Sequence, residues 1–330
     1  MAQRVLVTGG TGFVGGWTIV ELLRRGYQVR TTVRSAAREA DVRAAVARQV
    51  APDGLEFALA DLTADAGWDD AVAGCEAVLH IASPLGNGGD DEGLIAVAQG
   101  GTLRVLGAAA RAGVKRVVMT SSTAACTPAG PLERAIDESD WTDPAQKDLA
   151  VYRKSKVLAE KAAWDFIAGA PQTQLTTILP GAIFGPVLTR EHLGSVGIIQ
   201  RLLDGQPPAL PRLGFNITDV RDLAELHIKA METSEAAGQR YIALGEPLWY
   251  GEVAATLKER LGDRAAKVPT AAMPDLVAKG LAVASPQMKA LLPLLGRTQK
   301  FSTQKARAQL GFAPRPARDT VADCGASLVD

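Results

Sequence analysis

The sequence predicts an α/β protein: a doubly wound parallel sheet followed by a smaller, mostly helical C-terminal lobe. Three observations carry this prediction. Short apolar runs alternate with helix-length segments through the first half, the first of these runs leads directly into a glycine-rich turn, and the alternation becomes irregular after Pro180. Repeated strand–helix units of this kind build parallel sheets with helices on both faces.

The expected strands are the apolar and β-branched runs, and the expected helices are the amphipathic stretches between them. Strands are expected at residues 5–8, 28–33, 55–60, 77–82, 116–120 and 174–179. Helices are expected at residues 14–25, 36–50, 91–112 and 149–168. A later helix over 217–231 and a strand over 240–244 predict that the chain returns to its first domain.

The composition limits the classes of function. The chain has 330 residues, 47% of them hydrophobic, which is enough for about two domains with sizeable cores. Lys plus Arg and Asp plus Glu both number 36, so no general attraction to nucleic acid or to an anionic membrane is expected. Three cysteines without metal-ligand spacing, no signal sequence and no apolar run approaching about 20 residues predict a cytoplasmic protein.

A glycine turn follows the first expected strand. Gly9 permits a tight turn, Gly12 lets the backbone approach a phosphate, and Gly15 lets the next helix pack closely. The free N–H groups at the start of such a helix bind a pyrophosphate. The turn therefore predicts a Rossmann dinucleotide site. The residues expected to form it are Thr8, Gly9, Gly12, Phe13, Val14 and Gly15.

The residue after the second expected strand predicts which dinucleotide binds. A site for NAD places a carboxylate there, about 20 residues beyond the glycines, whereas this chain has Arg34, nineteen residues after the last glycine of the turn. A guanidinium suits the ribose phosphate of NADP(H). Arg38 or Arg43 is expected to add a second positive contact, and Asp61 and Leu62 are expected to contact the adenine.

A tyrosine, a lysine and a serine predict the chemistry. Tyr152 and Lys156 are four residues apart on an expected helix and so share a face, where the cation stabilises the phenolate. Ser122 follows a strand at the carboxyl edge of the sheet, where open α/β sheets bind ligands. Ser122 would bind a carbonyl oxygen, Tyr152 would donate a proton, and Lys156 would hold the nicotinamide ribose. Ser121 stays open as the alternative hydroxyl.

On these residues the chain resembles the extended short-chain dehydrogenases/reductases of the NAD-dependent epimerase/dehydratase superfamily. It is most similar to their dihydroflavonol reductase-like branch, which includes cinnamoyl-CoA and vestitone reductases and microbial aldehyde/ketone reductases. The TGxxGxxG spacing and the helix that continues from Tyr152 carry the resemblance. Further similar segments are residues 80–84, 140–143, 180–186, 219–222 and 301–311. The resemblance covers nearly the whole chain.

The resemblance implies further site residues. Ala82 and Ser83 would line the cofactor near the nicotinamide, and Pro180 and Ile183 would bind its carboxamide through the backbone. The implied substrate-binding residues are Leu85, Ser122, Tyr152, Phe184 and Leu188. His80 is expected to be a core or cofactor-wall residue, and no metal site is expected because the three histidines are scattered.

Together these observations predict a division of the chain. Residues 1–184 are expected to form the NADP-binding Rossmann domain, with 215–245 returning to it, and residues 185–214 and 246–330 are expected to form the substrate-binding lobe. The expected function is reduction of an aldehyde or ketone by NADPH, reversible as an alcohol dehydrogenase. We expect a small-molecule carbonyl substrate, no nucleic-acid or membrane partner, and a monomer or homodimer.

Two other functions stay open. The first is an NAD-dependent nucleotide-sugar epimerase or dehydratase, although Arg34 speaks against NAD, and Ala98 stands where many sugar epimerases have an asparagine. The second is a protein that senses NADP(H) without catalysis, although such proteins typically lose the Tyr/Lys pair that this chain keeps.

Overall fold

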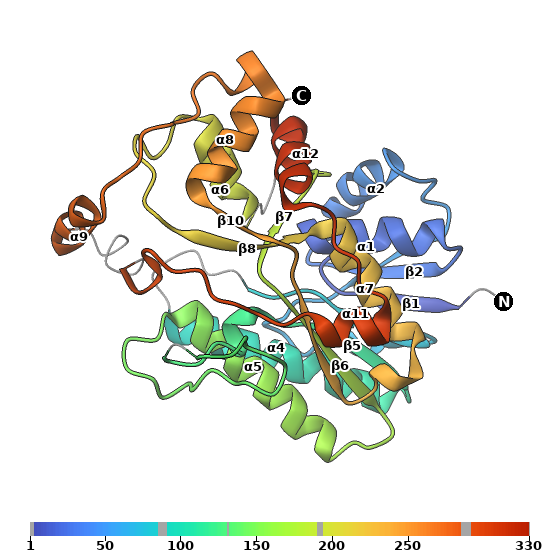
Figure 1. Cartoon of the computed structure of the whole chain (residues 1–330). Coiled ribbons are helices and arrows are strands. Elements are labelled where there is room, and N and C mark those ends of the chain that lie inside the picture. The colour runs from blue at the N-terminus through green and yellow to red at the C-terminus, as the bar shows by residue number, and fades with distance from the viewer. Residues whose placement is uncertain (1–2, 85–90, 131, 190–193, 285–291, 330) are drawn as a thin grey trace.

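A seven-stranded parallel sheet forms the centre of the fold (Figure 1). In the computed structural model, which describes residues 3–84, 91–130, 132–189, 194–284 and 292–329, its strand order is β3-β2-β1-β4-β5-β6-β9. The strands are β1 (Arg4–Val7), β2 (Gln28–Val33), β3 (Leu55–Leu59), β4 (Ala77–His80), β5 (Arg116–Thr120), β6 (Gln174–Pro180) and β9 (Gln239–Ala243). The predicted doubly wound parallel sheet is confirmed. Its order reverses between β1 and β4, and ligands bind at the carboxyl ends of strands at such a point.

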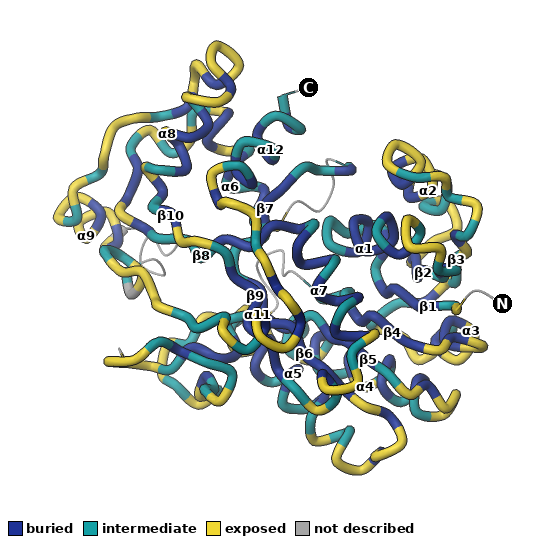
Figure 2. Tube along the Cα trace, turned by 45° about the vertical axis from the view of Figure 1, so that its right-hand side comes forward, coloured by how far each residue is buried: buried dark blue, intermediate teal, exposed yellow. Residues whose placement is uncertain are grey.

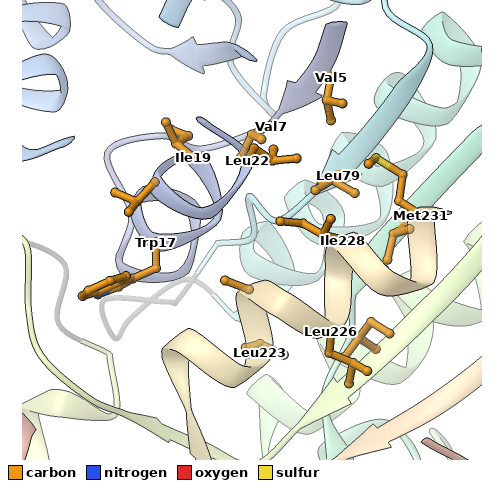
Figure 3. Packing of buried hydrophobic residues seen from close by; sticks show 14 of the residues in the cluster. Val5, Val7, Trp17, Ile19, Leu22, Leu79, Leu223, Leu226, Ile228 and Met231 are labelled. Atoms are coloured by element: carbon orange, nitrogen blue, oxygen red, sulfur yellow. The ribbon is translucent and has the colours of Figure 1, made fainter. Parts of the chain in front are cut away.

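Helices cover both faces of this sheet. One face carries α1 (Phe13–Arg24), α2 (Glu39–Ala47), α7 (Val220–Glu232) and α11 (Gln304–Leu310), and the other carries α3 (Trp68–Val72), α4 (Asp91–Arg111) and α5 (Val151–Ala168). Val5 and Val7 pack against α1 and α7, as Figure 3 shows, whereas Leu6 between them belongs to the core under α4. Since successive side chains of a strand point to opposite faces, a strand covered on both sides is continuously apolar.

A second, three-stranded sheet has the order β10-β8-β7 and a separate hydrophobic core. Its strands are β7 (Ala182–Phe184), β8 (Gly214–Asp219) and β10 (Pro247–Trp249). The helices α6 (Val196–Leu203), α8 (Tyr250–Leu261) and α12 (Ala317–Val329) pack on it, and α9 (Asp275–Ala284) lies farther out (Figure 1). Short 3-10 helices span Ala36–Arg38, Thr123–Ala125, Ser234–Ala236, Gly262–Ala265 and Leu292–Leu294.

Two of the expected helices were wrong in part. The helix expected over 217–231 begins only at Val220, because the residues before it form the end of β8 and pair with β7. The side chain of Asp219 accepts a hydrogen bond of 2.8 Å from the backbone N–H of Arg221 and so caps the helix there. The helix expected over 36–50 divides into a 3-10 turn and α2.

Helix α4 corrects the expectation that the chain has no apolar run of membrane-spanning length. By length and composition alone this 21-residue helix, which contains an 18-residue window with a mean hydropathy of 1.3, could cross a bilayer. In the structure, α4 packs against α5 and α3, and its buried residues, such as Val105 and Leu106, belong to the core on that face. That is the position of a core helix in a layered α/β fold.

Two buried histidines predict stability that is lost in acid. Burial lowers the pKa of His80 to about 3 and that of His227 to about 4. Each histidine binds a proton in the unfolded chain near pH 6.5 but in the folded chain only at lower pH. The free energy of unfolding therefore rises with pH in this range. As pH falls from about 6.5 to about 5, it is expected to fall by up to about 1.4 kcal/mol per pH unit for each histidine.

Urea unfolding at several pH values checks this. His227→Gln should reduce the pH dependence of the free energy of unfolding by the contribution of one histidine. Thr120→Val removes the hydroxyl that lies 2.7 Å from Nε2 of His227 but keeps the imidazole, so it should keep the slope. Equal slopes in the wild type and His227→Gln would contradict the assignment.

Candidate active site

Thr8 ties together the ends of the two strands at which the sheet order reverses. Its hydroxyl oxygen accepts hydrogen bonds from the backbone N–H groups of Ile81 (3.0 Å) and Ala82 (2.9 Å), and it lies 3.0 Å from Nδ1 of His80. Thr8 is fully buried. Because these groups use the hydroxyl completely, its role in the expected dinucleotide site is to shape the turn.

The glycine turn is as tight as its spacing predicted. Gly9 has a φ of +77°, and a Cβ on Gly15 would lie 2.3 Å from the carbonyl oxygen of Gly9. Sequence reasoning missed Gly10, where a Cβ would lie 2.3 Å from Oγ1 of Thr31. Gly12 begins α1 without a capping side chain, so the N–H groups of the first turn are free to bind a phosphate.

An open pocket of about 370 Å³ lies beside this turn, between α1 and α2. Arg38 lines it, and Arg34 is exposed at the end of β2. Arg43 points elsewhere: its guanidinium donates to the carbonyl oxygens of Pro52 (3.1 Å) and Leu55 (3.0 Å). Of the two arginines offered for a second contact, the structure therefore favours Arg38 and excludes Arg43.

Asp61 and Leu62 follow β3 at the same edge of the sheet. The N–H and hydroxyl of Thr63 donate to Asp61 at 2.8 and 2.7 Å, and together with the nearby charge of Arg34 they hold the pKa of this carboxyl below its usual range. Leu62 packs on α4 so closely that a Cβ on Gly101 would lie 2.8 Å from the Cβ of Leu62. Asp61 is thus an ionised acceptor beside Arg34, while the side chain of Leu62 faces the core.

Tyr152 and Lys156 lie at the start of α5 and meet a residue that follows β4. The ammonium of Lys156 lies 5.6 Å from the ring centre of Tyr152 and donates a hydrogen bond of 2.8 Å to the hydroxyl of Ser83. Lys156 is buried, whereas 40% of Tyr152 is exposed. Such an arrangement can hold a cation in place beside a phenol that remains accessible to a ligand.

The two adjacent serines have different surroundings. Ser121 is buried and donates a hydrogen bond of 2.6 Å to the carboxylate of Glu160. Ser122 begins the 3-10 helix Thr123–Ala125, where its oxygen accepts a hydrogen bond of 3.1 Å from the N–H of Ala124. Since a hydroxyl that accepts still has its own proton to donate, Ser122 can bind a carbonyl oxygen. This geometry favours Ser122 over Ser121.

The end of β6 and the strand after it contain the remaining residues that were expected to contact the cofactor. Pro180 is buried at the end of β6, and Ile183 lies in β7, the edge strand of the second sheet. On its other side β7 pairs with β8. An edge strand has unpaired backbone groups along one side, which suit a carboxamide.

Of the expected substrate residues, one is buried, one lines the pocket beside the glycine turn, and one cannot be placed. Phe184 is fully buried in the core of the second sheet, so it is not accessible to a substrate. Leu188 lines the pocket beside the glycine turn, and its carbonyl oxygen accepts a hydrogen bond of 2.7 Å from Arg48, which follows α2. Leu85 lies outside the described residues.

The model of the NAD dependent epimerase/dehydratase family matches residues 5–245, and the chain belongs to this family. Among curated proteins, it is 35% identical over 261 residues to cinnamoyl-CoA reductase 1 of Oryza sativa subsp. japonica, covering 78% of this chain and 75% of that protein.

Solved structures of reductases are also similar to this chain. The complex of yeast methylglyoxal/isovaleraldehyde reductase Gre2 with NADPH has a TM-score of 0.83 and 25% identity, covering 99% of this chain and 98% of that one. Vestitone reductase from alfalfa (Medicago sativa L.) has a TM-score of 0.74 and 27% identity, with 98% and 97% covered. The predicted resemblance to the dihydroflavonol reductase-like branch of the extended short-chain reductases is confirmed.

Proposed function

We propose that this protein uses NADPH to reduce the carbonyl group of an aldehyde or a ketone, and that it also catalyses the reverse oxidation of the alcohol. Its named relatives are reductases, and the enzyme is an NADP(H)-dependent oxidoreductase that acts on carbonyl and CH–OH groups. The observation that supports the finer proposal best is the meeting of Tyr152, Lys156 and Ser83 at the carboxyl edge of the sheet.

The residues around this edge fit a dinucleotide phosphate. The first turn of α1 would hold the pyrophosphate, Arg34 and Arg38 the ribose phosphate, and the free edge of β7 the carboxamide. Lys156 would hold the nicotinamide ribose. When bound, NADPH supplies the hydride that reduces the carbonyl carbon.

The protein's own side chains would stabilise the charge on the carbonyl oxygen and supply the proton that completes the alcohol. Ser122 donates a hydrogen bond to the carbonyl oxygen, on which negative charge develops as the carbon is reduced. Tyr152 donates its phenolic proton to that oxygen and completes the alcohol. The ammonium of Lys156 stabilises the phenolate that remains, and the hydroxyl of Ser83 orients this ammonium.

The proposal includes the division of the chain. Residues 1–184 and 215–245 would bind the cofactor, while residues 185–214 and 246–330 would bind the substrate. The fold moves three segments across these bounds: β7 and β8 belong to the second sheet, and α11 packs on the large one. The separate core of the second sheet supports such a lobe. We also propose a cytoplasmic monomer or homodimer with a small-molecule carbonyl substrate and no nucleic-acid or membrane partner. The three cysteines, all free and buried, fit a reducing compartment.

The two alternative functions have weaker support. A sugar epimerase of this superfamily would use an amide where this chain has Ala98, which is buried in the core under α4. A sensor without catalysis has no need for a lysine beside an accessible tyrosine. Both features favour the reductase.

Replacing the proton donor tests the mechanism. Tyr152→Phe should leave NADPH affinity unchanged, because the ring remains, and should lower kcat for carbonyl reduction by about two to four orders of magnitude. Fluorescence titration and NADPH absorbance measure the two quantities. Tyr27→Phe, which removes a phenol that donates to Glu232 away from the site, is the control and should retain kcat. Wild-type turnover in Tyr152→Phe would refute the assignment.

Replacing the arginine after β2 tests cofactor selection. Arg34→Asp should weaken NADPH binding by about 10- to 100-fold, because a charge-assisted contact becomes a repulsive one, and should change NADH binding much less. Titration of both dinucleotides measures the ratio. Arg43→Gln, whose guanidinium faces away from the pocket, should leave the ratio unchanged. An unchanged ratio in Arg34→Asp would mean that other groups bind the phosphate.

A further inference from the structure

Glu160 of α5 is a fully buried carboxylate to which the proposed reaction gives no role. It accepts hydrogen bonds from the hydroxyls of Ser121 (2.6 Å) and Thr177 (2.7 Å). Arg240 of β9, itself buried, donates to it from Nε at 2.8 Å and from Nη2 at 3.3 Å. The indole N–H of Trp164 lies 3.4 Å away. The carboxylate therefore joins α5 to β6, to β9 and to the segment that follows β5.

The position of Glu160 on α5 relates it to the reacting groups. Tyr152, Lys156 and Glu160 are spaced four residues apart, so they lie on one face of the helix, a turn apart from one another. Along this face the side chains go from 40% exposed at Tyr152 to 7% at Lys156 and 0% at Glu160. The face that presents the reacting groups at one end is thus anchored in the interior at the other.

The last residue of β5, Thr120, and the residue after it, Ser121, are held by helices on opposite faces of the sheet. The hydroxyl of Thr120 lies 2.7 Å from Nε2 of His227 on α7, while the next residue, Ser121, bonds to Glu160 on α5. The backbone N–H of Ser121 also donates to the carbonyl oxygen of Ile178 at 2.7 Å. Ser122 follows directly, so its place depends on these anchors.

A buried ion pair contributes little net stability, because the cost of removing both charges from water offsets their attraction. The burial of Glu160 and Arg240 is therefore explained better by the geometry that this pair imposes on its neighbours than by a gain in the free energy of unfolding. A charge-assisted hydrogen bond such as the one from Ser121 is stronger and more directional than a neutral one.

We infer that Glu160 and Ser121 are positioning residues for the reduction: the carboxylate holds Ser121, and Ser121 thereby sets the place of the Ser122 hydroxyl relative to Tyr152 and Lys156. This inference rests on the proposed function. Neither residue touches the reacting atoms. Their effect is to fix the distance between the group that binds the carbonyl oxygen and the group that protonates it, and small displacements of this kind slow enzymatic reactions strongly.

Thr177 provides a matched control on the same carboxylate. Its hydroxyl donates to Oε1 of Glu160 from the middle of β6, and Thr177 is fully buried. Ser121→Ala and Thr177→Val each remove one hydroxyl donor from Glu160, and only the first removes an anchor of the segment that carries Ser122. Removing Glu160 itself would leave Arg240 buried without a counter-charge and would threaten folding, so the hydroxyl variants are the better test.

The experiment measures kcat, the KM for the carbonyl compound and the NADPH Kd in the full chain, with the melting temperature alongside. Ser121→Ala should lower kcat by on the order of tenfold with an unchanged NADPH Kd. Thr177→Val should keep kcat, with a loss of melting temperature similar to that of Ser121→Ala. Ser121→Thr, which retains a hydroxyl, should recover most of the lost kcat.

Two results would overturn the inference: an unchanged kcat in Ser121→Ala, or an equal fall in kcat in Ser121→Ala and Thr177→Val. Tyr152→Phe in the same assay distinguishes failure of the positioning role from failure of the proposed function. If Tyr152→Phe keeps turnover, the proposed function fails. If Tyr152→Phe loses turnover while the two hydroxyl variants behave alike, only the positioning role fails.

Discussion

The pairing of Glu160 with Arg240 in the interior determines how helix α5 lies on the sheet. The carboxylate has no exposed surface, and its donors come from β6, β9 and the end of β5, so α5 cannot slide or rotate without breaking all these bonds together. A buried charge that loses its partners is costly, which makes such a shift unfavourable. The accessible phenol of Tyr152, two turns away, therefore has its position set by buried contacts. Helix α5 carries several buried residues (Figure 2).

The residues that follow β4 connect the glycine turn to the start of α5. The backbone N–H of Ala82 donates a hydrogen bond to the hydroxyl of Thr8. Ala82 also lies close to Gly9, because a Cβ on Gly9 would be 3.1 Å from the Cα of Ala82. The next residue, Ser83, accepts the hydrogen bond from Lys156. Two adjacent residues thus join the glycine turn to Lys156. The strand order makes this possible, because β1 and β4 are neighbours in the sheet and their carboxyl ends lie side by side.

Local features of the chain were predictable from the sequence, and pairings between distant segments were not. The strands of the large sheet, the glycine turn and the Tyr152–Lys156 pair follow from neighbouring residues and helical spacing. The bond from Lys156 to Ser83, the network of Glu160, the orientation of Arg43 and the burial of Phe184 depend on which segments the fold brings together. Strand β8 was missed because its pattern runs directly into that of α7, and only pairing with β7 and β10 separates the two.

The central claim is that hydride passes from the nicotinamide to a carbonyl carbon of a separate substrate, with the proton coming from Tyr152. The most direct measurement follows deuterium from NADPH labelled at C4 on the transferable position, during turnover of aliphatic aldehydes, aryl ketones and keto esters. The alcohol formed should carry deuterium on its carbinol carbon, one label for each NADPH oxidised. Oxidation of NADPH without label in the product, or no turnover across the panel together with conversion of a nucleotide sugar, would contradict it.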